Sequence, residues 1–340
     1  MDTSHPGIAF LVEHAGPIIR YRMARDWGVH GGESRDGLLR RVLETDEVAR
    51  WLGNLGGRDA HGSKDTCAEN GLAKLIEYGL DASVPAFDAR ARPYLEMLRP
   101  SPWDIPSDTL GPFLIAAGYG QLPAVRTWFL ERLAVLARTA EDGDYDIYAP
   151  EQKARRVPKA WRGRRIYKPA YWTGERRLPS IYDLYALAYW APESASQATA
   201  VERVIAFLAD PRYQATPGGY LWNTDRNTCY AAGRAWLACL DPQRTVLFLT
   251  LAARFPICHG QPWFRETLRN LVAFRTDRGT TIWPSDFLTE KRNSYYTYGG
   301  GHMGLGENRR RRIWREIEST FRMLEIERLM QTGPAAAISS

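Results

Sequence analysis

The sequence contains few cysteines and no long apolar run. Its four cysteines, Cys67, Cys229, Cys239 and Cys258, include no Cys-x-x-Cys pair, and a chain of 340 residues needs no disulfide framework to fold. No apolar stretch approaches the roughly 20 residues of a membrane-spanning helix. The first residues, MDTSHPGIAF, lack the basic start and long apolar centre of a signal peptide. We therefore expect a cytoplasmic protein with reduced thiols and no membrane span.

Excess positive charge is absent outside one segment. The formal net charge is +6, yet residues 151–177 hold ten Lys or Arg against two Glu, which leaves the rest of the chain slightly acidic. Trp161, Tyr167, Tyr171 and Trp172 are interleaved with these bases. Three interpretations stay open: a clamp for a diphosphate, a nucleic-acid patch, and a solvated cover over acidic residues. The acidic remainder and the lack of a recognised binding motif argue against nucleic acid.

Aromatic residues are plentiful in an otherwise ordinary globular composition. Apolar residues make up 44% of the chain and charged residues 25%, so disorder is not indicated. The 12 Trp and 17 Tyr are large rings with polar tips. They suit either a thick helical core or an aromatic-lined cavity, and both interpretations stay open.

A repeat of about 39 residues is the clearest pattern in the chain. Leu75-Ile-x-x-Gly79 followed by Pro85-Ala returns as Leu114-Ile-x-x-Gly118 followed by Pro123-Ala. Each copy predicts an apolar helix, a glycine stop, a short turn, and a second helix that begins with proline. Repeats of this length are typical of stacked helix pairs, none of which can bury its apolar face alone.

Helical periodicity extends this pattern over most of the chain. We expect one all-α domain over residues 1–330, made of five or six helical hairpins, with a long basic aromatic loop at 141–179 and a flexible tail at 331–340. The helical segments are expected at 17–55, 65–98, 109–136, 181–208, 230–239, 245–255, 263–274 and 305–330.

Two segments resemble the terpenoid cyclase and protein prenyltransferase superfamily. They are residues 114–133, with Leu114-Ile-Ala-Ala-Gly118-Tyr119, Pro123-Ala-Val-Arg126 and Leu130-Glu-Arg-Leu133, and residues 274–283, Phe274-Arg-Thr-Asp277-Arg-Gly279-Thr-Thr-Ile-Trp283. The resemblance implies an α/α toroid, in which inner and outer helices surround a central cavity that opens at the N-terminal ends of the inner helices. The residues themselves predict only stacked hairpins, and closure into a ring comes from the resemblance.

The run Asp142-Gly-Asp144-Tyr-Asp146 is one candidate site. Adjacent carboxylates repel, so one can keep its proton at neutral pH and act as a general acid, or the cluster can hold a divalent cation. Cyclases of the resembled superfamily that protonate an alkene use an Asp-x-Asp-Asp run, and Asp144-x-Asp146-Ile147 lacks the last aspartate. A solvated acidic turn that neutralises the neighbouring bases is the alternative.

Polar residues that precede inner-type helices form a second candidate site. We expect Asp183 to act as a base, His302 as a proton shuttle and Arg177 as an anion clamp. A satisfied structural network is the alternative for each of them. The further residues expected to contact substrate are His61, Tyr182, Tyr230 and Tyr298.

Two short segments match parts of zinc sites. Asp65-x-Cys67 resembles part of the protein prenyltransferase site, and Cys258-His259-Gly260 resembles part of the site of lanthionine cyclases. Neither segment has a complete ligand set by spacing, so the sequence disfavours zinc. A divalent cation at the aspartates is the remaining metal alternative.

These features predict an isoprenoid-processing enzyme, terpene cyclase-like or prenyltransferase-like. Its substrate would be an apolar small molecule such as a prenyl diphosphate, held in an aromatic-lined central cavity where π faces stabilise cationic intermediates. Two alternatives stay open. One is a noncatalytic helical-repeat scaffold that binds peptide or nucleic acid, and the other is a carbohydrate-active toroid enzyme.

Overall fold

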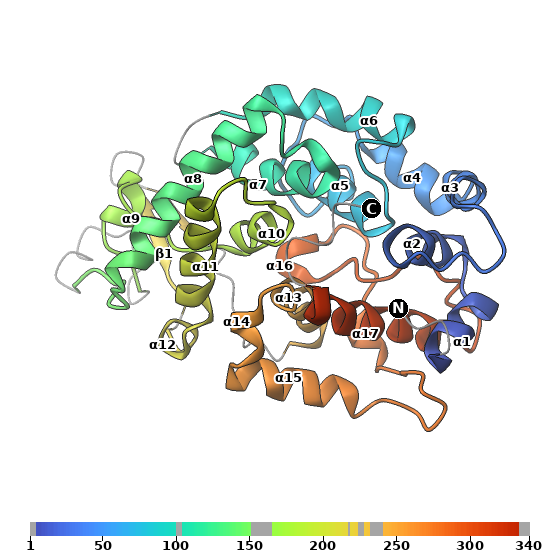
Figure 1. The fold of residues 1–340 in the computed structure, drawn as a ribbon. Coiled ribbons are helices and arrows are strands. Elements are labelled where there is room, and N and C mark those ends of the chain that lie inside the picture. The colour runs from blue at the N-terminus through green and yellow to red at the C-terminus, as the bar shows by residue number, and fades with distance from the viewer. Residues whose placement is uncertain are drawn as a thin grey trace.

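The computed structural model describes residues 5–99, 104–150, 165–216, 218–223, 228–231 and 241–332, and most of them are helical (Figure 1). None of the helices in these ranges is long and apolar enough to cross a membrane. Six helices with largely buried surfaces, which we call the central helices, occupy the middle of the molecule. They are α2 (Pro17–Trp27), α5 (Ala68–Glu77), α7 (Ile105–Leu114), α10 (Ile181–Tyr189), α13 (Pro242–Ala252) and α17 (Trp314–Thr332).

Contacts among the central helices run from one to the next. Every residue of α5 and eight of the nine residues of α10 are buried, which requires neighbours on all faces of these helices. Helix α5 packs against α7, α7 against α10, α10 against α13, and α13 against α17. The rings of Trp27 in α2 and Phe321 in α17 stack with centroids 4.9 Å apart. Nη1 of Arg22 in α2 donates to the main-chain oxygen of Glu77 in α5.

The remaining helices lie around this group, except η2 (Ile115–Tyr119) and α16 (Tyr296–Gly299), which contact the central helices within it (Figure 1). They are amphipathic, as α15 illustrates: Trp263, Phe264, Thr267 and Leu271 lie at helical spacing on its buried face. The longer ones are α1 (Pro6–His14), α3 (Arg35–Leu43), α4 (Asp46–Asn54), α6 (Pro85–Ala91), α8 (Pro123–Asp142), α11 (Ala195–Ala209) and α15 (Pro262–Val272). The short ones are η1 (Arg92–Met97), α9 (Ala170–Thr173), α12 (Pro211–Gln214), α14 (Pro256–His259) and η5 (Ser285–Leu288).

The two predicted hairpin turns are confirmed. Gly79 and Gly118 have φ values of +89° and +90°, the left-handed conformation in which glycine is favoured. Pro85 begins α6 and Pro123 begins α8, as expected. The two turns lie side by side, because the amide of Ala82 donates to the carbonyl of Ala117 at 2.8 Å. The all-α class is therefore confirmed, and the closed toroid stays a prediction.

Two expected helices are corrected. Residues 228–231 form strand β2 (Thr228–Ala231), which pairs antiparallel with β1 (Tyr220–Asn223), where a helix was expected to begin at 230. Both strands are rich in residues that favour extended backbone. Residues 232–239 of that expected helix lie outside the described residues. The last helix starts at Trp314 rather than 305, because the amides of Leu305 and Glu307 donate to the carboxylate of Glu318 instead of continuing a helix.

The middle of the molecule is filled by aromatic side chains. The ring of Phe113 in α7 lies 4.7 Å from that of Tyr185 and 6.2 Å from that of Tyr296, measured between centroids. Tyr296 begins the short helix α16, which contacts α5, α10 and α13 (Figure 1). These contacts favour the core interpretation of the aromatic residues.

Candidate active site at the N-terminal ends of the central helices

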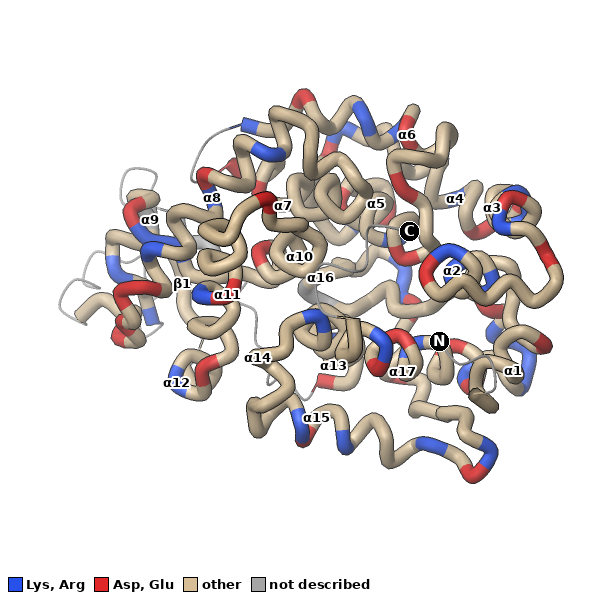
Figure 2. The backbone as a smooth tube through the Cα atoms, in the orientation of Figure 1, with Lys and Arg blue, Asp and Glu red and all other residues tan. Residues whose placement is uncertain are grey.

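The two aspartates after α8 lie on the surface in ion pairs. Nζ of Lys168 lies 3.2 Å from Oδ2 of Asp144 and 3.0 Å from Oδ2 of Asp146, whose side chain is 79% exposed. Burial opposes ionisation of Asp144, but Lys168 and Arg176 outweigh it and hold the pKa of this carboxyl below its ordinary value. Figure 2 shows acidic and basic residues interspersed at the end of the molecule near α8 and α9. Asp144 is therefore ionised at neutral pH, which favours the acidic-turn interpretation over the general acid.

Asp183 and Arg177 belong to a buried ionic network. Asp183 accepts hydrogen bonds from the amide and hydroxyl of Ser180, in a capping box that starts α10. Arg132 contacts both Asp183 and Asp108, and Nη2 of Arg177 lies 2.6 Å from Oδ2 of Asp108. Burial would raise the pKa of Asp183, but the two arginines lower it below its ordinary value. This network joins α7, α8 and α10, which supports a structural role for both predicted residues.

His302 lies in another buried network. Its Nδ1 is 3.3 Å from Oε1 of Glu290, its Nε2 is 2.8 Å from the carbonyl of Ser294, and its ring meets Trp51 edge-on at 5.2 Å. Nζ of the buried Lys74 lies 2.7 Å from the other oxygen of Glu290. Burial disfavours the Glu290 anion, but Lys74 and His302 prevail and lower its pKa to about 2. The contacts thus assign Asp144, Asp183 and His302 to three different networks.

Two of the predicted substrate contacts, His61 and Tyr182, are brought together by Glu69. Glu69 lies in the first turn of α5 and is only 1% exposed. One carboxylate oxygen accepts the hydroxyl of Tyr182, and the other lies 2.9 Å from Nδ1 of His61. The ring of Tyr295 lies 5.4 Å from that of His61. We call these four residues the Glu69 cluster. The side chains of the other two expected contacts, Tyr230 and Tyr298, lie outside the described residues.

The local sequence holds His61 in place through Asn70. The Asn70 amide nitrogen donates to the carbonyls of Gly62 and Lys64, at 2.9 Å each, and its oxygen accepts the amide of Tyr296 at 3.0 Å. Gly62 also donates its amide to Glu69 at 3.0 Å. Asn70 is fully buried, so the loop before α5 is fixed to α5 and to the start of α16 at once.

The Glu69 cluster has the groups that proton transfer requires. A buried carboxylate lies beside a partly exposed imidazole, a side chain that can exchange protons with a bound molecule. The N-terminal ends of α5 and α10 stabilise negative charge on Glu69. The side chain of His61 is 31% exposed, so it can reach a bound molecule. Among the described residues, no group of three or more His, Cys, Asp or Glu side chains could hold a metal ion.

The partial zinc motifs take structural positions. Cys67 is the N-cap of α5 and Cys258 lies in α14, and both are buried. Burial raises the pKa of Cys258 to about 12, so its thiolate is scarce. A ring nitrogen of His259 lies 2.8 Å from the carbonyl of Ala253. These cysteines therefore act as small core residues.

Comparison with known proteins assigns no family. No protein-family model matches the sequence, and no curated protein or solved structure is significantly similar to it. The functional argument therefore depends on the geometry of the molecule.

Proposed function

We propose that this chain is an enzyme whose reaction includes a proton transfer at the Glu69 cluster. The neutral imidazole of His61 takes up the proton, Glu69 stabilises the positive charge that then forms on the ring, and Tyr182 donates a hydrogen bond to Glu69. One observation carries the proposal: a fully buried carboxylate contacts both an accessible histidine and a tyrosine, and each comes from a different segment of the chain. Proton transfer by a positioned side chain accelerates reactions by about 10²–10⁴-fold.

The substrate class that we propose first is an isoprenoid. The six central helices would be the inner ring of an α/α toroid, and the Glu69 cluster would lie at the end where these helices begin. The rings of Tyr182 and Tyr295 beside His61 suit a carbocation, which aromatic faces stabilise. His61 would remove a proton from the carbon next to the cationic centre. The C–H electron pair then forms the alkene, and the protonated His61 returns its proton to water.

A carbohydrate is the second candidate substrate, and the partly exposed His61 favours it. A histidine and a tyrosine can remove the acidic C–H proton of a uronate sugar.

The test is His61→Ala, assayed against prenyl diphosphates, linear isoprenoids, and neutral and uronate oligosaccharides. We expect wild-type turnover in one class and at least a roughly 100-fold loss of kcat in the variant, because the proton-accepting group is removed. Glu69→Gln keeps an acceptor for Tyr182 but removes the negative charge beside His61, so it should also lower kcat. His30→Ala, at an exposed position, is the matched control and should keep full activity. Wild-type inactivity on every substrate, or an active His61→Ala, would contradict the proposal.

A further inference from the structure

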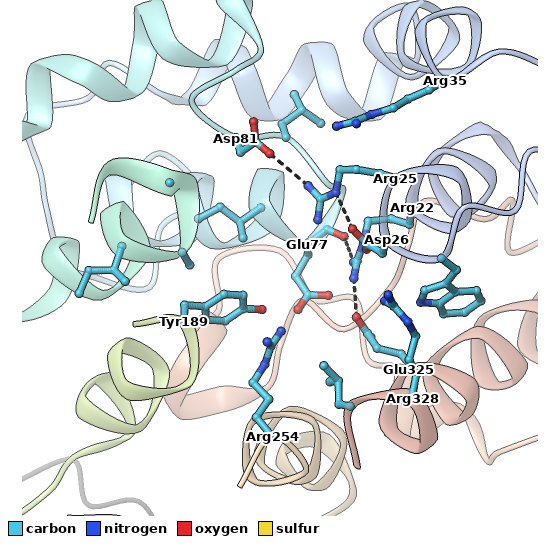
Figure 3. Close-up of a pocket in the computed structure, with 17 residues that line it drawn as sticks. Arg22, Arg25, Asp26, Arg35, Glu77, Asp81, Tyr189, Arg254, Glu325 and Arg328 are labelled. Atoms are coloured by element: carbon cyan, nitrogen blue, oxygen red, sulfur yellow. Dashed lines mark hydrogen bonds and ion pairs between the residues drawn. The ribbon is translucent and has the colours of Figure 1, made fainter. Parts of the chain in front are cut away.

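A pocket of about 160 Å³ lies where α5, α10 and α13 end, at the opposite ends of these helices from the Glu69 cluster. Residues of α2, η2 and α17, together with Arg35 of α3 and Leu80 and Asp81 after α5, complete its wall (Figure 3). Five arginines and four carboxylates line it among the described residues.

Two of the arginines are fully engaged. Arg22 contacts both Asp26 and Glu325, and Arg25 contacts Asp26 at 2.6 Å and Asp81 at 3.6 Å (Figure 3). Both also donate to main-chain oxygens near the end of α5, which is the ordinary role of cations at helix C-termini.

The remaining carboxylate of the pocket, Glu77, also has a cationic partner. One of its oxygens lies 2.7 Å from Nη2 of Arg322, which lies outside the pocket lining. Its other oxygen accepts the hydroxyl of Tyr296. All four carboxylates of the pocket therefore already have a cationic partner.

Arg254 and Arg328 lack the paired contacts of Arg22 and Arg25, and the fifth arginine, Arg35, is an exposed residue at the start of α3. Arg254 is only 6% exposed, and its Nε and Nη1 atoms have no hydrogen-bond partner among the described residues. Its guanidinium points into the pocket, 4.2 Å from the ring centroid of Tyr189 (Figure 3). Arg328 faces the same space from α17, and the carboxylates that attract it, Asp26 and Glu325, are already paired with Arg22. Two like charges in one small pocket, one of them with unused buried donors, are an unfavourable arrangement unless an anion joins them.

We propose that this pocket binds a compact oxyanion, a phosphate or carboxylate group, between Arg254 and Arg328. The planar guanidinium of Arg254 would donate to two oxygens of the anion along its edge, while the ring of Tyr189 covers one face of the guanidinium. The pocket matches the roughly 150 Å³ cavities that admit a benzene ring, so it holds a group of about five or six heavy atoms rather than a polymer. The site is separate from the Glu69 cluster and does not depend on the proposed proton transfer.

The test is calorimetric titration of the full chain with inorganic phosphate and, separately, with malonate, in low-salt buffer free of multivalent anions. We expect the wild type to bind at least one of them at millimolar concentration or below. Arg254→Met should weaken that binding at least tenfold, Arg254→Lys should weaken it less, and Arg328→Met should also weaken it. Arg269→Met, on the exposed face of α15, is the matched control and should bind like the wild type. The anion that binds with the higher affinity identifies the ligand as a phosphate or a carboxylate.

Two results would overturn the proposal. One is a wild type that binds neither anion at millimolar concentration. The other is a folded Arg254→Met variant, verified by circular dichroism, that binds as tightly as the wild type. If Arg254→Met does not fold, unchanged binding by both Arg254→Lys and Arg328→Met has the same consequence.

Discussion

Buried ionisable side chains give single residues a large influence on stability. Glu318 of α17 is fully buried, and burial raises its pKa to about 7, although the amides of Leu305 and Glu307 donate to it. Arg309 and Lys74 act in the opposite direction but do not cancel the effect of burial. This carboxyl therefore keeps its proton at pH values where the unfolded chain has lost it.

We predict that the free energy of unfolding falls between about pH 4.5 and pH 7 because of Glu318. The unfolded glutamate releases its proton near pH 4.5 and the folded one near pH 7, so each step upward in this window favours unfolding. The loss approaches about 3 kcal/mol. Glu318→Gln should remove this slope, because the amide has no charge at any pH. Urea unfolding across the window measures it.

The matched control for this prediction is Glu266→Gln, at an exposed position of α15. It should leave the pH dependence of stability as it is in the wild type. Equal slopes for the wild type and Glu318→Gln would show that Glu318 is ionised in the folded protein.

Two residues of the Glu69 cluster could be predicted from the sequence, and Glu69 itself could not. His61 and Tyr182 were expected to contact substrate because each precedes or begins an inner-type helix, a local signal. Glu69 was missed, because its partner Tyr182 lies 113 residues away along the chain. The local signal for it is its position: Glu69 is the acidic residue in the first turn of α5.

At the scale of the element, the two matched turns permit a direct comparison. A Cβ at Gly118 would meet only Ala82, at 3.9 Å, whereas a Cβ at Gly79 would lie 2.8 Å from Cδ of Arg22 and 3.1 Å from Cε1 of Tyr21. Both glycines have positive φ, so alanine at either position strains the backbone by about 1–2 kcal/mol.

We therefore predict that Gly79→Ala destabilises the protein more than Gly118→Ala. The first variant must also displace Arg22, which holds Asp26 and Glu325, whereas the second carries the backbone strain alone. We expect about 1–2 kcal/mol for Gly118→Ala and at least about 1 kcal/mol more for Gly79→Ala. Chemical denaturation of both variants is the measurement. Equal losses would mean that Arg22 moves aside without cost.

The elements that the sequence predicted correctly are those bounded by glycine and proline residues that end or start a helix. Glycine followed by proline identified the turns at 79–85 and 118–123 because both residues act through their own backbone. The start of α17 was wrong because Glu318 binds amides of a segment that is helical only in its periodicity. The strand at 228–231 was missed because it forms through hydrogen bonds to another segment, residues 220–223, and not through a local signal.

At the scale of the whole molecule, buried ion pairs join distant parts of the chain. Nζ of Lys74 in α5 contacts Glu290 at 2.7 Å and the carbonyls of His302 and Gly304 at 2.9 and 2.5 Å. Lys74 thus holds one central helix to the segment that leads into α17.

We predict that Lys74→Met costs about 3 kcal/mol of unfolding free energy, because it leaves the Glu290 carboxylate without its main partner. This is the lower end of the range for buried pairs, since the Glu290 side chain is 24% exposed. The double variant Lys74→Met/Glu290→Gln should recover about 1 kcal/mol or more, because no charge is left unpaired. A double-mutant cycle by chemical denaturation measures the coupling energy between Lys74 and Glu290. If the two losses of unfolding free energy simply add, the proposed coupling is excluded.

The contact between α2 and α17 also has a consequence for synthesis. Arg22 and its partner Glu325 are 303 positions apart, and Trp27 stacks on Phe321. Because a ribosome adds about 5–20 residues per second, about 15–60 s pass between the synthesis of α2 and that of α17, which covers it. During that interval the face of α2 that later meets α17 is uncovered. The nascent chain therefore passes through a stage in which a chaperone, or a second nascent chain, can bind to α2 in the place of α17.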